Sequence, residues 1–131
     1  MASEERETDL APPIFRDVSS SARLESPRLL DEADVRDLMW KSVGLFRERS
    51  ALREAVNQLQ AQEAMLEAIL SSGTQLDHAG WRRASIVTVG SLIAQAALRR
   101  EESRGGHFRI DHPAHDDSKW KIHVSDVIHR S

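Results

Sequence analysis

Five side chains that can bind charged groups lie within eight positions of one another towards the C-terminus. They are Glu102, Ser103, Arg104, His107 and Arg109. An arginine guanidinium can donate parallel hydrogen bonds to a carboxylate, or single bonds to backbone carbonyls, across a protein interface. We therefore expect these residues to lie at an interface with another domain, because a helix end needs fewer specific residues. The alternative is a solvated helix end whose arginines bind only the last carbonyls.

Histidines and aspartates of the same stretch are of the types that ligate transition metals. The set comprises His107, His112, His115, His123, Asp111, Asp116 and Asp117. Imidazole and carboxylate ligands suit zinc, nickel or copper. Their spacing matches no established metal site, however, and polar tails readily produce such clusters. We assign no metal ligand, no catalytic residue and no cofactor-binding residue to this chain.

Composition limits the classes of partner. The chain has 131 residues, a net charge of -3 and no cysteine. A mixed, slightly acidic charge argues against binding nucleic acid or an anionic membrane. No stretch is long and apolar enough to cross a bilayer, and the acidic N-terminus lacks the apolar region of a signal peptide. These features, with the absence of cysteine, favour a cytoplasmic protein.

The first part of the chain lacks helical periodicity. It contains Pro12, Pro13 and Pro27 and a run of serines. Such a segment cannot bury enough apolar surface to offset the entropy of ordering it. We interpret residues 1–28 as a largely irregular linker and residues 29–131 as one domain.

Three apolar stripes of helical period follow the linker. They predict helices from Asp31 to Phe46, from Ser50 to Leu70, and from an N-cap at Asp77 to about Arg104. The third segment is apolar around most of its circumference, which is typical of a central helix or of one that faces two partners. We expect Trp81 to pack on the other helices and Trp120 to anchor the tail. The predicted fold is all-α: an antiparallel three-helix bundle with an irregular N-terminal linker and a polar C-terminal tail.

Three segments together resemble a known family. Residues 98–113, LRREESRGGHFRIDHP, are similar to the E-S-R-G-x-H-[YF]-R-x-D-[FY]-P segment of succinate dehydrogenase, fumarate reductase and L-aspartate oxidase flavoproteins. Residues 117–123 resemble its D-x-x-W-x-x-H continuation, and residues 38–47 resemble the L-M-W-x-x-V-G-[IL]-x-R run that opens the helical C-terminal domain. The order and spacing agree over roughly residues 30–123. One departure is His112, where the family has an aromatic residue.

Within this superfamily the compact helical domain and short tail favour L-aspartate oxidase. The resemblance then implies FAD-dependent oxidation of L-aspartate to iminoaspartate, the first step of quinolinate and NAD synthesis in bacteria. The chain has no G-x-G-x-x-G fingerprint for FAD. The family's FAD-contacting and catalytic residues lie in its FAD and capping domains, and none of them maps here.

We therefore expect a C-terminal domain that is not a catalyst by itself, with the FAD and capping domains as its partners. Its apolar face would favour self-association when isolated. Two alternatives stay open: the same domain of a succinate dehydrogenase or fumarate reductase flavoprotein subunit, and a stand-alone helical interaction module.

Overall fold

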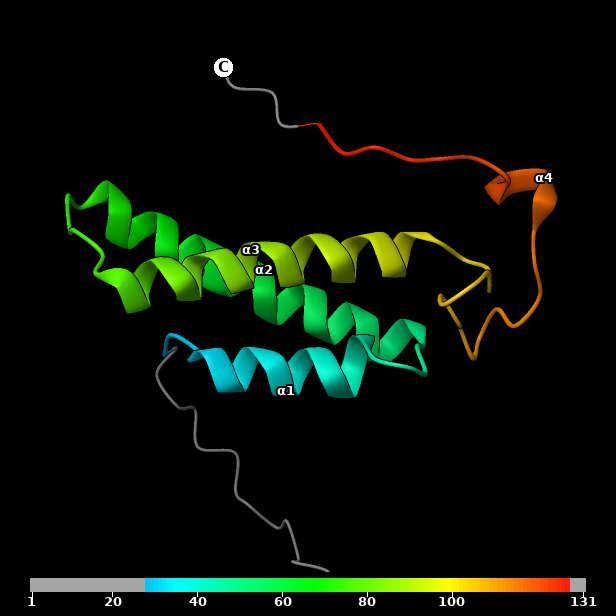
Figure 1. Cartoon of the computed structure of the whole chain (residues 1–131), viewed down its shortest axis with the longest axis horizontal. Coiled ribbons are helices and arrows are strands. Elements are labelled where there is room, and N and C mark those ends of the chain that lie inside the picture. Colours follow the sequence, from blue (N-terminus) through cyan, green and yellow to red (C-terminus); the bar gives the residue numbers. More distant parts are fainter. Residues whose placement is uncertain (1–27, 128–131) are drawn as a thin grey trace, which may run out of the picture.

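The domain is an antiparallel bundle of three long helices, which confirms the predicted fold class. The computed structural model describes residues 28–127, so residues 1–27 of the predicted linker lie outside the described residues. Helices α1 (Glu32–Val43), α2 (Arg49–Ser71) and α3 (His78–Arg99) run up, down and up (Figure 1). A single-turn helix, α4 (Asp117–Trp120), lies in the tail that was expected to be irregular. Between residues 28 and 127 there are isolated β-bridges but no β-strand.

Helix α1 is held at its start by a reciprocal cap and is stopped by a glycine. Asp31 accepts a hydrogen bond from the backbone of Asp34 at 2.8 Å, and the Asp34 carboxylate accepts one from the backbone of Asp31 at 3.1 Å. A Cβ atom on Gly44 would lie 2.3 Å from the carbonyl oxygen of Trp40, so no larger residue fits there. The helix ends at Val43, not at Phe46 as predicted, because the backbone of Gly44 leaves the helical conformation with a ψ of −133°. The Phe46 side chain is 68% exposed.

Helix α2 carries most of the core stripe that the sequence predicts. Its N-cap is Glu48, and the predicted cap Ser50 instead donates a hydrogen bond to the Glu48 carboxylate. The helix ends at Ser71, and Gly73 follows with a φ of 79°, a conformation that glycine adopts without strain. Leu70, expected in the core, is partly exposed because the bundle ends beside it.

Helix α3 begins where the sequence predicts and ends earlier. The Asp77 carboxylate caps it by accepting a hydrogen bond from the backbone of Gly80 at 2.7 Å. The helix ends at Arg99, not at Arg104, because the backbone of Arg100 turns to an extended conformation. Trp81, expected to pack on the bundle, is 54% exposed.

The core lies between the three helices and is aliphatic. Its buried members are Val35, Val43, Leu52, Ala55, Val56, Leu59, Leu66, Val87, Ala94 and Ala97. Gly90 lets α1 approach α3 closely, since a Cβ atom at this position would lie 3.3 Å from the sulfur of Met39. The predicted helical periodicity thus places the main apolar contacts correctly.

One polar side chain inside the bundle holds the segment that leads into α1. Gln62 is buried, although helical periodicity assigns it to the polar face of α2. Its side-chain oxygen accepts a hydrogen bond from the backbone of Leu30 at 2.7 Å, and its nitrogen donates to the carbonyl of Arg28 at 3.1 Å. The start of the described chain is therefore fixed to α2 by an amide that satisfies two backbone groups.

The tail returns along the bundle after α4 (Figure 1). Arg99 pairs with Asp126 at 2.9 Å on the surface. Trp120 joins the tail to the end of α3 through Arg100, whose guanidinium lies 5.6 Å from the centre of the indole ring and donates to the Trp120 carbonyl at 2.6 Å. This confirms the predicted anchoring role of Trp120. No helix within residues 28–127 has the length and apolar character needed to span a membrane.

We predict that Leu59→Ala lowers the free energy of unfolding by about 2–5 kcal/mol, because Leu59 is fully buried and its removal leaves a cavity. Leu70→Ala, on the same helix but 41% exposed, should cost less than about 1 kcal/mol. Urea unfolding of both variants measures the difference. Equal costs would contradict the described core.

Candidate functional site

The loop that follows α3 is built around a fully buried arginine. Arg109 has no exposed surface. Its Nε and Nη2 donate to the two carboxylate oxygens of Asp111 at 2.8 and 2.6 Å. Its Nη1 donates to the carbonyls of Ala97, Leu98 and Arg100 at 3.1, 3.0 and 3.3 Å. The guanidinium therefore satisfies the last carbonyls of α3 and its charge is balanced by one carboxylate.

Glu102 is a second buried charge in the same loop. Its side chain is fully buried and accepts hydrogen bonds from Arg100 at 2.8 Å, from Arg104 at 2.9 and 3.1 Å, and from the backbone of Asp116 at 2.9 Å. The hydrogen bond from Arg104 and the further donors hold the pKa of Glu102 at about 2, against its ordinary value of 4.5. Arg104 also pairs with Asp117 at the start of α4. Glu102 thus joins the end of α3 to the tail.

Ser103 closes the loop between these two charges. Its hydroxyl donates to the carbonyl of His112 at 2.8 Å and accepts from the backbone of Arg109 at 2.9 Å. Its own backbone nitrogen donates to the carbonyl of Ala114 at 3.1 Å. A small side chain with one donor and two acceptor positions fits this buried place.

His107 is held in one tautomer by its partners. Because Arg47 can only donate, the 2.7 Å contact from its Nη1 makes Nδ1 of His107 the acceptor. Nε2 then carries the proton and donates to the carbonyl of Arg100 at 2.9 Å. Burial lowers the pKa of His107 and the nearby Arg47 charge adds to this effect, so the neutral ring is favoured.

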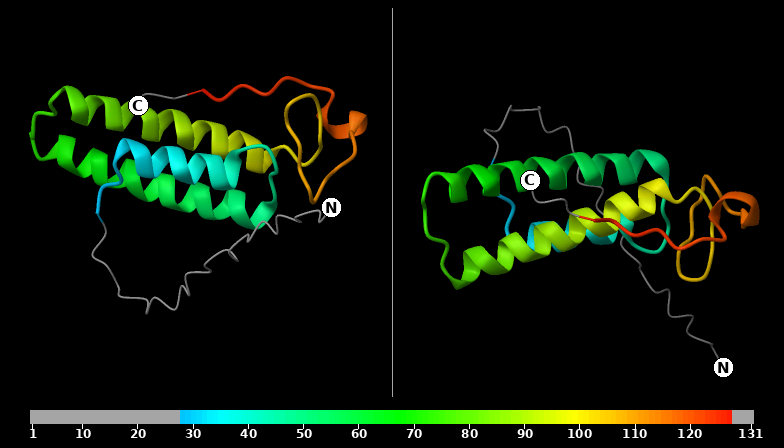
Figure 2. Two further views of the ribbon diagram at one scale, coloured as in Figure 1. Left: turned by 60° about the horizontal axis from the view of Figure 1, so that its bottom comes forward. Right: turned by 90° about the horizontal axis from the view of Figure 1, so that it is seen from above.

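Backbone hydrogen bonds join this loop to the turn between α1 and α2. The nitrogen of Arg47 donates to the carbonyl of Phe108 at 3.2 Å, and the nitrogen of Ile110 donates to the carbonyl of Arg47 at 2.7 Å. Figure 2 shows the two connections side by side at one end of the bundle. The segments around Arg47 and Arg109, 62 positions apart (109 − 47), therefore form one unit.

The structure brings together the five residues expected at an interface, but they differ in burial. Glu102, Ser103 and Arg109 are buried and bonded within the domain, whereas Arg104 and His107 are partly exposed. The interface itself stays a prediction.

Sequence reasoning missed the roles of Arg47, Arg100 and Asp111 in this network. The resemblance of residues 38–47 to a family motif ending in arginine was the available signal for Arg47. Within residues 28–127 no group of three or more histidine, aspartate or glutamate side chains is placed to hold a metal ion.

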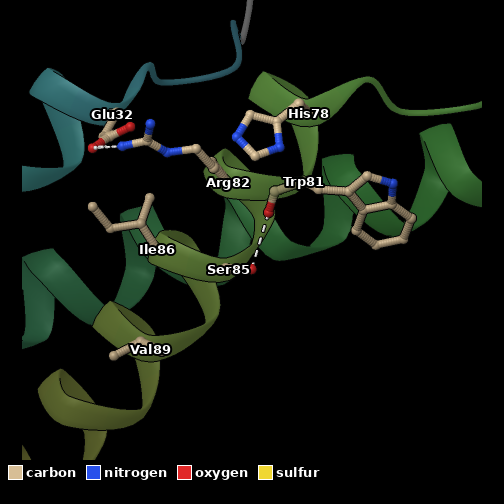
Figure 3. A pocket seen from close by; sticks show the side chains of 7 residues that line it. All are labelled: Glu32, His78, Trp81, Arg82, Ser85, Ile86 and Val89. Carbon is tan, nitrogen blue, oxygen red and sulfur yellow. Dashed lines mark hydrogen bonds and ion pairs between the residues drawn. The ribbon is translucent and has the colours of Figure 1, made fainter.

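A groove of different character is lined by residues of α1 and α3 (Figure 3). Its lining residues are Glu32, His78, Trp81, Arg82, Ser85, Ile86 and Val89. The carboxylate of Glu32 pairs with Arg82 at 3.0 Å and with Arg36 at 2.5 Å. The Ser85 hydroxyl donates to the carbonyl of Trp81. The carboxylate of Glu32 and the hydroxyl of Ser85 are thus already paired within the domain. The groove therefore presents mainly apolar surface.

Comparison with known proteins identifies relatives over most of the chain. The family model described as "Fumarate reductase flavoprotein C-term" matches residues 32–129. The fumarate reductase flavoprotein subunit of Helicobacter pylori is 37% identical over 92 residues, which are 66% of this chain and 13% of that protein. The L-aspartate oxidase of Streptomyces coelicolor is 33% identical over 95 residues, 69% of this chain and 16% of that protein.

A third named activity occurs among the relatives. The succinate dehydrogenase flavoprotein subunit of Coxiella burnetii is 29% identical over 106 residues, 77% of this chain and 18% of that protein. The chain thus spans less than a fifth of the length of these three relatives. No solved structure matches it with significance.

We predict that Arg109→Met lowers the free energy of unfolding by about 3–5 kcal/mol, because it leaves a carboxylate and three carbonyls without their donor. Arg109→Lys should recover only part of this loss, since an ammonium cannot make the two parallel bonds to Asp111. Arg36→Lys, on an exposed pair, should change stability by less than about 0.5 kcal/mol. Chemical denaturation compares the three, and a cost for Arg109→Met as small as that for Arg36→Lys would refute the role of this guanidinium.

We predict that the contribution of Glu102 to stability is lost on acidification. Its folded pKa lies below its ordinary value, so the unfolded chain binds more protons as the pH falls from about 4.5 to about 2. Above about pH 4.5 the contribution is complete. Melting temperatures measured from about pH 6 downwards should therefore fall less steeply for Glu102→Gln than for the wild type in this window. Glu67→Gln, at an exposed position of α2, serves as the control and should leave the slope unchanged.

Proposed function

Because the chain belongs to the family of fumarate reductase flavoprotein C-terminal domains, we propose that it is the helical packing domain of an FAD-dependent L-aspartate oxidase. In this proposal the domain binds the FAD and capping domains of the flavoprotein and takes no part in the chemistry. The parent enzyme oxidises L-aspartate to iminoaspartate, which supplies quinolinate and NAD synthesis. The Streptomyces relative named L-aspartate oxidase supports this choice of reaction.

The observation that carries the packing role is the distribution of apolar side chains. Among the described residues, thirteen large hydrophobic side chains are exposed, whereas ten hydrophobic side chains form the buried core. Contiguous patches of exposed apolar side chains mark contacts with other proteins. The excess therefore favours a domain that packs against a larger body.

The described residues do not fit FAD itself. A dinucleotide binds with its pyrophosphate at the N-terminus of a helix, where backbone N–H groups and the helix dipole attract negative charge. Here a carboxylate stands at the N-cap of every long helix, at Asp31, Glu48 and Asp77. These carboxylates repel a pyrophosphate. The proposal accordingly assigns the flavin to the FAD domain of the parent.

A second candidate is the same packing role in a fumarate reductase or succinate dehydrogenase flavoprotein subunit. The relative from Helicobacter pylori, named a fumarate reductase flavoprotein subunit, supports this alternative. The two candidates share the domain and differ in the reaction of the parent. The stand-alone helical module and the self-association of the isolated domain stay predictions.

The test is to purify the tagged chain from its native host and to measure bound flavin and polypeptide composition. We expect one FAD-bearing polypeptide segment for each copy of this domain, continuous with it or associated with it. Aspartate-dependent release of hydrogen peroxide from the purified material would support the oxidase. Fumarate reduction or succinate oxidation without aspartate oxidation would favour the second candidate. A folded chain that carries no flavin-bearing polypeptide would contradict both and favour the stand-alone module.

A further inference from the structure

We infer that the flavin-bearing body docks on an apolar surface at one end of the bundle, and that it presents a carboxylate to Arg47 there. This inference rests on the proposed function and adds the location and chemistry of the contact. We call the surface the end patch. It consists of Leu45, Phe46, Arg47, Phe108 and Ile110.

The end patch is apolar and accessible. Leu45, Phe46 and Ile110 are 69%, 68% and 52% exposed, and Phe108 is 40% exposed. They come from the turn between α1 and α2 and from the loop after α3, which lie together at one end of the bundle (Figures 1 and 2). Aromatic residues and arginine are enriched at protein interfaces relative to the rest of the surface.

The end patch is also held in a fixed shape. The ring of Phe46 meets that of Phe108 edge to face, with their centres 6.1 Å apart. The two segments that carry these rings are joined by the backbone hydrogen bonds of Arg47. Arg109 is buried next in sequence to Phe108, so the loop cannot shift without breaking its hydrogen bonds. A surface that is ordered before it binds loses less entropy on binding.

At this end of the bundle Arg47 lacks, within the described part of the chain, the ion pair that neighbouring arginines make. Its neighbours Arg100, Arg104 and Arg109 each pair with a carboxylate. Within residues 28–127 no carboxylate lies within ion-pair distance of Arg47. Arg47 therefore has no ion-pair partner among the described residues.

The hydrogen bonds of Arg47 leave one edge of its guanidinium for a partner. Its Nε donates to the carbonyls of Val43 and Gly44 at 2.9 and 3.2 Å, and its Nη1 donates to His107. Nη2 makes no hydrogen bond to a described residue. Partial burial lowers the pKa of Arg47. A carboxylate on the partner would complete the arrangement, because charged hydrogen bonds gain strength where water is excluded.

The groove beside Trp81 is the rival surface, and the end patch is preferred over it. In the groove Glu32 already pairs with Arg36 and Arg82, so its charge, unlike that of Arg47, is balanced among the described residues. Trp81 stands 18 residues before the end of α3 at Arg99, which is about 27 Å along the helix. The two surfaces can therefore be tested separately.

The experiment compares variants of the tagged chain for binding to the flavin-bearing polypeptide that the wild type retains. Phe46→Ser should weaken binding by about tenfold or more, because a central aromatic contact is lost. Trp81→Ser, a matched change of an exposed aromatic at the far end, should alter binding by less than about twofold. Circular dichroism of both variants establishes that they fold. Loss of binding by Trp81→Ser alone would overturn the inference and assign docking to the groove.

A second pair of variants tests the charge. Ile110 lies in the end patch, where its backbone nitrogen donates to the carbonyl of Arg47 at 2.7 Å. Ile110→Asp should weaken binding more than Ile110→Asn, because a carboxylate in the end patch repels the carboxylate of the partner. The two side chains have nearly the same size, so the difference reports charge. Equal binding, or tighter binding by Ile110→Asp, would refute the carboxylate.

Hydroxyl-radical footprinting of the unmodified complex provides a readout that does not depend on variants. Oxidation of Phe46 and Phe108 should fall on complex formation, while oxidation of Trp81 should not. If the wild type retains a flavin-bearing polypeptide but Phe46 stays fully reactive and Phe46→Ser binds normally, this inference alone is wrong. If the wild type retains none, the proposed function is wrong, and this inference falls with it.

Discussion

The burial of the Arg109 guanidinium is the interaction on which the rest of this end of the molecule depends. All of its donor atoms are used, and three of its bonds go to the last carbonyls of α3. It therefore ends the helix, positions the following loop and balances the charge of Asp111 at once. Because a planar guanidinium donates in fixed directions, few other arrangements of the loop could satisfy it.

Glu102, a buried charge of opposite sign, fixes the tail to the end of α3 in a similar way. Glu102 collects donors from Arg100, from Arg104 and from the backbone of Asp116. Breaking either network would leave a charge in the interior without a partner, which costs more than the intact pair contributes. Such networks therefore specify one loop conformation more than they raise overall stability.

Placing charges inside this corner has a consequence for its outer surface. Within the S-R-G-G-H-F-R-I-D stretch Ser103 and Arg109 are buried, whereas Phe108 and Ile110 are exposed, with the Phe108 ring against that of Phe46. A stretch that reads as polar from its composition thus supports an apolar surface. Two residues with specific chemistry, Ser103 and Arg109, are thus structural, while their neighbours Phe108 and Ile110 are exposed.

The sequence by itself determined the three helices, the caps at Asp31 and Asp77 and most of the aliphatic core. These features follow from local spacing and from side chains that bond within their own turn. Only the tertiary structure decided that α3 ends at Arg99, that Gln62 is buried and that Phe46 is exposed. Each of these outcomes depends on a group distant in sequence. Arg109 lies 12, 11 and 9 residues after the carbonyls of Ala97, Leu98 and Arg100 that it binds. The backbone groups bound by Gln62 lie 32 and 34 residues before it, and the ring that Phe46 contacts is that of Phe108. Periodicity reports which face of a helix is apolar, but it carries no information about which distant donor or acceptor will reach that face.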